Sequence, residues 1–401
     1  NGKFEKASWS EVFNIIKSKL NNVDKDKVCG LTGDLVNMET LYIFKEFFNK
    51  TLGSYNIESR NDHTYLNPEK RENYLFNSTI NGIEKADFIF IVGSNPRYEA
   101  TILNARIRKA YLQNKTKIIS FNDVGDLTYP YECLNGDIEN IKKITEDNHE
   151  ISSLIKNAKN PLIIFGKSSL NSKSAKYIFE SIKSFLKKNG KISEEWNSLN
   201  VISENASTVG SYDLGLYKTE DGSNEVLKDL ENHKFEIVYL LGLDSFKFEK
   251  KDEFIIYQGS HGDKGAEMAD IILPGAAYTE QNGYFTNLEG KLQKAYKASY
   301  PPEDAKEDWA IINELAEAMN HRKLFNDKDE LDSSLLNQIN LYIEKNKSIK
   351  SSDFKDLKFD QEIIKLCSED YYYSNVIARA SKTMLDCKSA KTNLRSTGTE
   401  G

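Results

Sequence analysis

Three uninterrupted apolar runs, each followed directly by glycine, constrain the fold of this chain more than any other feature of its sequence. The runs are Phe88–Val92, Pro161–Phe165 and Ile237–Leu241, and the glycines are Gly93, Gly166 and Gly242. A strand with one face in water alternates apolar and polar residues, whereas a parallel strand that is buried on both faces shows no alternation. Each run therefore predicts a central strand of a parallel sheet, and each glycine predicts a turn into the next element.

Shorter apolar stretches and helical patterns continue this alternation along the chain. Further strands are expected at residues 28–31, 118–121, 254–257 and 271–273. Helices are expected at residues 9–20, 36–48, 97–113, 175–186 and 308–319, and Ser8 and Glu11 form a capping box at the start of the first. Alternating strands and helices predict an α/β fold with doubly wound, mostly parallel sheets in two similar lobes.

The expected domain organisation follows the order of these elements. The first α/β lobe is placed at residues 1–150 and the second at residues 151–325, with a charged stretch at residues 137–160 near their boundary. Residues 326–401 are expected to form a polar excursion and a carboxyl-terminal tail. Because residues 326–360 are rich in Lys, Asp, Ser and Asn, we interpret them as a surface excursion with one helix.

Composition excludes several classes of partner. Lys and Arg number 54 against 61 Asp and Glu, a net charge of −7, so the chain has no positive field that would gather nucleic acid. Its apolar runs are far shorter than the roughly 20 residues that span a bilayer, so no direct membrane span is expected. Its four cysteines, at 29, 133, 367 and 387, form no CxxC pair. They are interpreted as reduced, mostly buried thiols and not as a metal site.

Ligands of doubly wound sheets bind beyond the carboxyl ends of the strands, so four loops are candidate ligand sites. These loops are residues 93–96, 242–245, 259–263 and 275–278. The first could cradle a phosphate with its free amides, but the chain has no GxGxxG or P-loop motif, which favours a tight strand-to-helix turn.

Arginine is rare in this chain, and three of its eight arginines cluster at Arg97, Arg106 and Arg108. Such a cluster suggests planar, bidentate pairing, which lysine cannot supply, although a solvated helix face explains it equally well. Arg97 lies at the expected start of a helix, where the helix dipole is already positive. We therefore expect it to have a carboxylate or anionic partner.

Other polar residues near strand ends are weaker candidates for chemistry. Ser260 and His261 are adjacent in sequence, which disfavours the geometry of a nucleophile and its base, and no GxSxG motif is present. Asp123, Asp126 and Asp263 could bind a hard cation, but satisfied turn carboxylates are the more common case. Asp270 precedes a buried strand, where it is expected to cap a neighbouring amide. The residues alone therefore indicate a large α/β body with loops that could bind ligand and with no competent catalytic set.

Two longer segments carry a family resemblance. The stretch ADIILPGAAYTE at 269–280, continued by GYFTNLEGK at 283–291, resembles the molybdopterin oxidoreductase superfamily. The stretches GSNPRYEA at 93–100 and NARIR at 104–108 resemble one branch, the large iron-sulphur subunit of respiratory NADH:ubiquinone oxidoreductase, complex I. IARASKTM at 377–384 is similar to the mitochondrial carboxyl terminus of that subunit. The resemblance covers most of residues 8–387, except roughly 326–357.

The chain also departs from this family in ways that limit what the resemblance implies. The family's amino-terminal half holds iron-sulphur clusters on closely spaced cysteines, and this chain has no such set. True molybdenum members supply a Cys, selenocysteine or Ser to the metal, whereas no cysteine lies between Cys29 and Cys133, and residues 260–268 replace a Thr-Glu-Thr-Ala type loop. The resemblance therefore implies a vestigial cofactor crevice, with Gly93, Asn95, Gly259 and Asn287 as its remnants.

The function that the resemblance implies is a non-catalytic structural domain of the peripheral arm of complex I. It would lie on the matrix side of the inner mitochondrial membrane and support a partner chain that carries the ferredoxin-like half. No cofactor is expected in this chain, while iron-sulphur clusters and FMN are expected in partner chains. Arg97, Arg106, Arg108 and Asp270 are expected to be structural or interface residues. The alternatives are a molybdopterin-dependent oxidoreductase lobe that binds a pterin nucleotide, and a stand-alone nucleotide-binding protein.

Overall fold

The apolar runs form the centres of two five-stranded sheets in which every pairing is parallel. The computed structural model describes residues 3–219, 221–320, 322–349, 354, 357–367 and 370–396. The first sheet has the order β10 (Ile271–Pro274), β9 (Phe254–Gly259), β8 (Ile237–Leu241), β1 (Val28–Thr32) and β2 (Ile57–Glu58). The second has the order β5 (Glu132–Cys133), β4 (Lys117–Ser120), β3 (Phe88–Val92), β6 (Pro161–Phe165) and β7 (Leu199–Val201).

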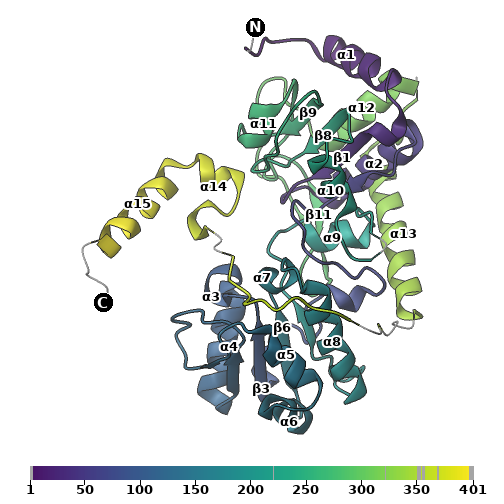
Figure 1. Cartoon of the computed structure of the whole chain (residues 1–401). Helices are drawn as coiled ribbons and strands as arrows, with labels where there is room; N and C mark the ends of the chain where they lie inside the picture. Colours follow the sequence, from purple (N-terminus) through teal and green to yellow (C-terminus); the bar gives the residue numbers. More distant parts are fainter. Residues whose placement is uncertain are drawn as a thin grey trace.

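Both strand orders are doubly wound, as the sequence predicts. The order reverses between β1 and β8 in the first sheet and between β3 and β6 in the second. Figure 1 shows the two sheets in separate bodies, each surrounded by its own helices. An antiparallel hairpin of β11 (Gly283–Thr286) and β12 (Leu292–Ala295) is attached to the first body.

The expected boundary at residue 150 is wrong, because the lobes are not consecutive halves of the chain. The first sheet takes β1 and β2 from the beginning of the chain and β8 to β10 from residues 237–274, while the second sheet takes all its strands from residues 88–201. All five residues of β6 pair with β3, across the predicted boundary. Runs that are apolar on both faces are interchangeable as central parallel strands, so the pattern identifies strands without showing which ones pair.

Helices cover both faces of each sheet. On the first sheet, one face carries α1 (Trp9–Asn21), α2 (Met38–Glu46), α12 (Asp308–Asn320) and α13 (Lys328–Lys347). The other carries α10 (Glu225–Glu231) and α11 (Lys264–Met268). On the second sheet, one face carries α5 (Ile138–Thr145), α6 (Glu150–Asn157), α7 (Lys167–Leu170) and α8 (Ala175–Lys188), and the other carries α4 (Thr101–Asn114).

The remaining described elements are short or lie in the tail. They are α3 (Pro96–Glu99), α9 (Thr208–Asp213), α14 (Val376–Ala380) and α15 (Lys382–Ser396), a π-helical turn (Phe47–Leu52), and 3-10 turns at Lys25–Lys27, Arg71–Asn73, Asn81–Lys85 and Tyr371–Tyr373. The capping box expected before α1 is confirmed, since Ser8 and Glu11 cap each other. None of the described helices is both long and apolar enough to cross a bilayer.

Two stretches that the sequence presents as polar contribute to the core. The charged stretch at residues 137–160 contains α5 and α6, whose isoleucines at 138, 141, 144, 151 and 155 are buried. In the expected surface excursion, Leu331, Leu335 and Ile339 of α13 are buried in the first core, and Tyr342 bonds the buried Tyr74 hydroxyl at 2.6 Å. The interpretation of 326–360 as a surface excursion is therefore wrong for α13, whose narrow apolar stripe is hidden in a polar composition. Residues 350–353 and 355–356 lie outside the described residues.

The cysteines are less buried than expected. Cys29 lies in the core within β1, whereas Cys133 is half-buried and Cys367 and Cys387 are exposed. Burial raises the pKa of the Cys29 thiol, so this cysteine stays protonated and is a poor metal ligand. Among the described residues, no three His, Cys, Asp or Glu side chains come together in a way that could hold a metal ion.

Candidate functional site at the carboxyl ends of the strands

Glycines bring two loops into backbone contact at each point where the strand order reverses. A Cβ on Gly33, after β1, would lie 1.7 Å from the carbonyl oxygen of Gly242, after β8. In the second sheet, a Cβ on Gly166 would lie 2.3 Å from the Cβ of Ser94. Doubly wound folds bind ligands in the crevice that opens at this reversal. Here the root of each crevice is filled by the opposite loop.

A small pocket lies beyond the reversal in the first sheet, and we call it the switch-point pocket. Its lining includes Gly242, Asp244, Gly259, Asp308, Val376 and Ile377. The last two belong to α14, so the tail of the chain reaches back to the first sheet.

Two carboxylic acids, the buried Asp308 and the half-buried Asp244, line the switch-point pocket. Asp308 accepts hydrogen bonds from the side-chain amides of Gln258, at 2.8 Å, and Gln281, at 2.7 Å. Burial raises its pKa to about 6, although both amides oppose the shift. Asp244 accepts a hydrogen bond from the Tyr257 hydroxyl, and burial raises its pKa to about 6 as well. Both acids titrate near neutral pH, so the pocket becomes more negative as pH rises through 6.

The raised pKa of Asp308 predicts a pH-dependent effect on stability. Because its folded pKa of about 6 lies above the ordinary 3.8, its contribution to stability is fully present below about pH 4 and is lost as pH rises through 6. Asp308→Asn removes this dependence, while Asp244 titrates equally in both proteins. The unfolding free energy of the variant relative to the wild type should therefore rise by on the order of 3 kcal/mol between pH 4 and 7.5. Chemical denaturation at several pH values measures this, and parallel pH curves for the two proteins would contradict it.

A larger cavity lies between the two bodies, and we call it the interlobe cavity. It has a volume of about 90 Å³ and is lined by the loops that follow β1, β2, β6 and β7, together with the 3-10 turn Arg71–Asn73 and α9. Asn73 in its wall is only 3% exposed, yet neither polar atom of its side chain has a hydrogen-bond partner within the described structure. An unpaired buried amide costs about 1–3 kcal/mol, so ordered water in the cavity is expected to satisfy it.

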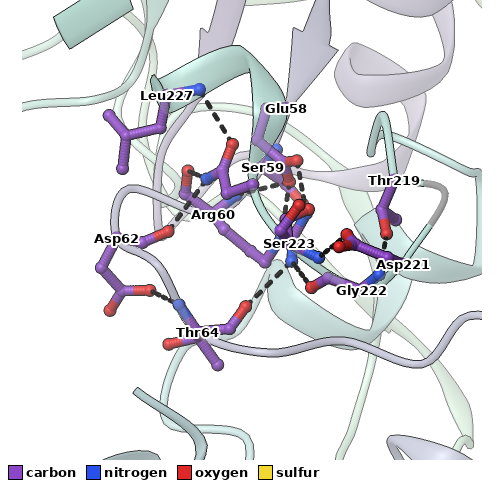
Figure 2. Close-up of polar contacts among 11 residues, drawn as sticks. Glu58, Ser59, Arg60, Asp62, Thr64, Thr219, Asp221, Gly222, Ser223 and Leu227 are labelled. Atoms are coloured by element: carbon purple, nitrogen blue, oxygen red, sulfur yellow. Dashed lines mark hydrogen bonds and ion pairs between the residues drawn. The ribbon is translucent and has the colours of Figure 1, made fainter. Parts of the chain in front are cut away.

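Arg60 lines the interlobe cavity, and other groups of the protein accept hydrogen bonds from all of its side-chain N–H donors. Its Nε and Nη2 form a fork on the Glu58 carboxylate at 2.9 and 2.7 Å, and both residues are buried. Its other N–H groups donate to the backbone carbonyls of Thr64, Gly222 and Ser223 at 2.9–3.0 Å. Figure 2 shows these contacts converging on the guanidinium group. All five donors are used, so Arg60 has none left for a ligand.

The other charges around the interlobe cavity are mostly negative. Lys167 lies 3.4 Å from Asp62 and 3.6 Å from Glu204, and Asp34 accepts a hydrogen bond from Asn205 at 2.8 Å. With the charge of Arg60 neutralised by Glu58, three carboxylates line the cavity against one lysine. The cavity therefore repels anions.

Neither the interlobe cavity nor the switch-point pocket is lined by more than one of the four expected crevice residues. In the loop that contains Gly93 and Asn95, Glu99 accepts the Asn95 amide at 2.8 Å and the Ser94 hydroxyl at 2.6 Å, so a carboxylate takes the place of a phosphate. Gly259 lines the switch-point pocket on the other sheet. Asn287 turns the β11–β12 hairpin and accepts the amides of residues 289 and 291. The loop at 93–96 is thus a tight turn, as the motif search favours.

The three clustered arginines have partners, but none makes the expected fork with a carboxylate. Arg97 contacts Asp126 through Nη1 alone, at 2.6 Å, which confirms that it has a carboxylate partner. Arg106 contacts Glu84 through Nη1, and Arg108 donates to a backbone carbonyl at 3.3 Å. The forks occur at Arg60 and at Arg71, whose Nε and Nη2 both bind Asp213 at 2.8 Å. Clustering in sequence was the wrong signal, because a fork needs a carboxylate that the tertiary fold positions.

The remaining polar candidates are turn and cap residues. Asp270 accepts the Ile255 amide at 2.8 Å, as expected. Asp123, Asp126 and Asp263 each accept a nearby backbone amide, which confirms them as turn carboxylates. Ser260 Oγ and His261 Nδ1 do lie 2.9 Å apart, contrary to the expectation that adjacent residues avoid this geometry. Ser260 is exposed, and the structure shows no carboxylate that orients His261 among the described residues, so the pair lacks the third member of a triad.

No pattern in the sequence indicated the interlobe cavity. Its lining converges from loops as distant as residues 34, 60, 167 and 204. The one signal available for Arg60 was the rarity of arginine, since its neighbours form no motif. The backbone contact of the paired glycines likewise could not be read from single loops.

The sequence profile of the molybdopterin oxidoreductase family matches residues 1–318. The chain belongs to this family. The fold agrees, because acetylene hydratase from Pelobacter acetylenicus superposes with a TM-score of 0.60 at 12% identity, over 87% of this chain and 64% of the hydratase. A chain from the formyltransferase/hydrolase complex of Methylorubrum extorquens gives a TM-score of 0.53 at 12% identity, over 80% of this chain and 98% of that chain.

Closer family relatives are found by sequence. The chain is 34% identical over 413 residues to the NADH-ubiquinone oxidoreductase 75 kDa subunit of Reclinomonas americana, covering 97% of this chain and 59% of that protein. It is 35% identical over 408 residues to the mitochondrial NADH-ubiquinone oxidoreductase 78 kDa subunit of Candida albicans, covering 96% of this chain and 55% of that protein. A potato relative, NADH dehydrogenase [ubiquinone] iron-sulfur protein 1, is 32% identical over 96% of this chain and 52% of its own length. The chain thus spans a little over half the length of these relatives.

The residues present do not fit the cofactor for which the family is named. A pterin nucleotide carries phosphate groups, which need positive or amide-lined sites at the carboxyl ends of the strands. Here the charge of Arg60 is neutralised by Glu58, and the backbone amide of Asn95 in the 93–96 loop already donates to Glu99. The interlobe cavity is lined by more carboxylates than lysines. The crevice therefore favours water over a phosphorylated ligand.

Proposed function

We propose that this chain is a non-catalytic structural domain of the large peripheral-arm subunit of respiratory complex I, located on the matrix side of the inner mitochondrial membrane. Several relatives that match at least 96% of this chain are named as components of an NADH-ubiquinone oxidoreductase or NADH dehydrogenase. The observation that best supports a role without chemistry is the saturated Arg60. Among the described residues that line the interlobe cavity it is the buried cation, and the protein's own groups use all of its donors.

In this role the two bodies brace neighbouring subunits, and electrons from NADH pass through FMN and iron-sulphur clusters in partner chains. A chain or segment with the ferredoxin-like half is the expected partner. The large buried cores of the two bodies suit a rigid support. The proposal assigns no cofactor to these residues.

Elemental analysis and native electrophoresis test this proposal. The isolated chain is expected to contain neither stoichiometric molybdenum nor iron with acid-labile sulphide, and to give no pterin fluorescence after oxidation. In membranes from the source cells it should migrate in a very large NADH-oxidising assembly. Recovery with bound molybdenum and pterin would instead support the second candidate, a molybdopterin-dependent oxidoreductase lobe, which the family match favours.

We propose that the exposed arginines of the second body face partner subunits. Arg108 is exposed and Arg97 is partly exposed, with 39% of its side chain accessible. Arg108→Glu is expected to lower the abundance of the assembled complex several-fold, because it reverses a charge at the interface. NADH oxidation per assembled complex should stay unchanged. Arg97→Lys is the matched control, since a lysine can keep the single contact with Asp126. Normal abundance with lost turnover would mean that this body takes part in the chemistry.

A further inference from the structure

The tail of the chain crosses from the second body to the first, and we call residues 370–391 the carboxyl-terminal arm. Before the arm, the chain is tied to the second body. Ile364 is buried and its backbone bonds Gly136 and Asn122, while the Cys367 amide donates to the Ser168 hydroxyl at 2.8 Å. Figure 1 shows this extended segment along the second body and α14 and α15 beside it. The arm therefore starts from a fixed point next to the loops of the second sheet.

Helix α14 docks on the first body, at the point where a doubly wound sheet usually takes its ligand. Val376 is 5% exposed, and with Ile377 it lines the switch-point pocket opposite Gly242 and Gly259. Asn375 starts the helix by accepting the Ala378 amide at 2.9 Å. The docked face is thus apolar and is held in a defined helical turn.

An arginine secures this contact. Arg379 Nε donates to Asp263 Oδ2 at 2.6 Å, and only 23% and 18% of the two side chains are exposed. The positive charge of Arg379 also acts on the half-buried Asp244 and partly opposes the rise in its pKa. The pocket is lined by two carboxylic acids, Asp244 and Asp308, and Arg379 pairs with Asp263 near them, so the charge of this region complements the arm.

Both ends of the arm contact the second body. The ring of Tyr371 meets that of Tyr98 edge-on, with centroids 6.3 Å apart, and Lys391 Nζ lies 5.0 Å from the centre of the Tyr98 ring. Tyr98 belongs to α3, directly after β3. The arm therefore bridges the carboxyl ends of both sheets.

From these contacts we propose that the switch-point pocket is a docking site for a short helix of the type Val-Ile-x-Arg, filled in cis by residues 376–379. The arm straps the two bodies together and occupies the crevice in which this fold would otherwise take a ligand. The pocket selects an apolar pair followed by arginine, because it offers an apolar opening beside Asp263 and Asp244. This inference does not depend on the function proposed above.

Charge exchange across the Arg379–Asp263 pair tests the proposal in the full chain. Hydrogen exchange of the amides at 375–380 should be about tenfold faster in Arg379→Asp and in Asp263→Arg, a ratio that corresponds to ~1.4 kcal/mol. The double variant should restore most of the protection. Lys382→Glu, an exposed residue of α15, is the matched control and should leave exchange unchanged.

The core amides at residues 88–92 report whether each variant is folded. If Asp263→Arg disturbs them, Asp263→Asn replaces it, since asparagine can still cap residue 264. Unchanged exchange at 375–380 in all single variants, or no recovery in the double variant, would overturn the proposal.

Binding in trans examines the same site. A fluorescent peptide of residues 370–391 should bind the Val376→Asp full chain, whose own arm is released, with an affinity at least tenfold higher than it binds the wild type. The Arg379→Asp peptide should bind neither protein. Equal binding of both peptides to the released chain would refute recognition of the arginine.

Discussion

Replacing Arg60 with alanine is expected to lower the free energy of unfolding by about 3–5 kcal/mol, because it leaves a buried carboxylate without its partner. Glu58 is fully buried, and the fork from Arg60 supplies its counter-charge. The substitution also removes the hydrogen bonds that Arg60 donates to the carbonyls of Thr64, Gly222 and Ser223. Equilibrium denaturation in urea measures the loss.

A control variant and a double variant test the physical reason for this loss. Lys347→Ala breaks an exposed pair with Glu344, in which both side chains are more than 60% accessible, and should change stability by no more than about 0.5 kcal/mol. Replacing Glu58 and Arg60 together by methionine should recover part of the loss, because no isolated charge remains. A loss below about 1 kcal/mol in Arg60→Ala would show that water already screens the pair.

Gly93→Ala is expected to destabilise the chain by roughly 2–5 kcal/mol, the sum of a backbone cost and a steric cost. Gly93 has a φ of +68°, and a Cβ there would lie 2.3 Å from the backbone nitrogen of Ser169. Both the conformation and the contact with α7 require glycine, so the loops at the reversal of the second sheet would have to separate.

Gly125→Ala isolates the backbone cost. Gly125 has almost the same φ, +69°, but no atom lies within 4 Å of the position that an alanine methyl group would take there. Gly125→Ala should lower the free energy of unfolding by about 1–2 kcal/mol, because only the left-handed backbone conformation disfavours alanine there. Thermal and chemical denaturation of both variants give the difference. Equal losses would mean that the loops after β3 and β6 can move apart freely.

The sequence pointed to some of the residues that matter here and gave no sign of others. Gly93 was recognisable because a glycine after an apolar strand is typical of a turn, and Asp270 because a carboxylate before a buried strand commonly caps an amide. Arg60 had no such context. Its partners include Glu58, two residues away, and the carbonyls of residues 222 and 223, which only the tertiary fold brings near.

The family resemblance predicted more of the structure than the local sequence patterns did. It predicted the fold and the lack of a cofactor-ready crevice from segments such as 269–291, and the family match confirms the fold. The crevice remnants that it predicts, Gly93, Gly259 and Asn287, lie after strands of two different sheets and in a hairpin, and neither pocket is lined by more than one of them. A motif keeps residues together in sequence, whereas a binding site needs them together in space.

The sequence by itself determined the strands β1, β3, β4, β6, β8, β9 and β10, their parallel character and the turns that follow them. It did not indicate the short strands β2, β5 and β7 or the hairpin of β11 and β12. Unbroken apolar runs such as Phe88–Val92 leave no choice, because only a strand that is covered on both faces buries every side chain of the run. Tertiary structure alone decided that β1 pairs with β8 and β3 with β6, and that α14 returns to the first body. These contacts join residues from 70 to more than 300 positions apart, and each strand satisfies its backbone with any parallel neighbour. The choice therefore depends on how the whole chain packs.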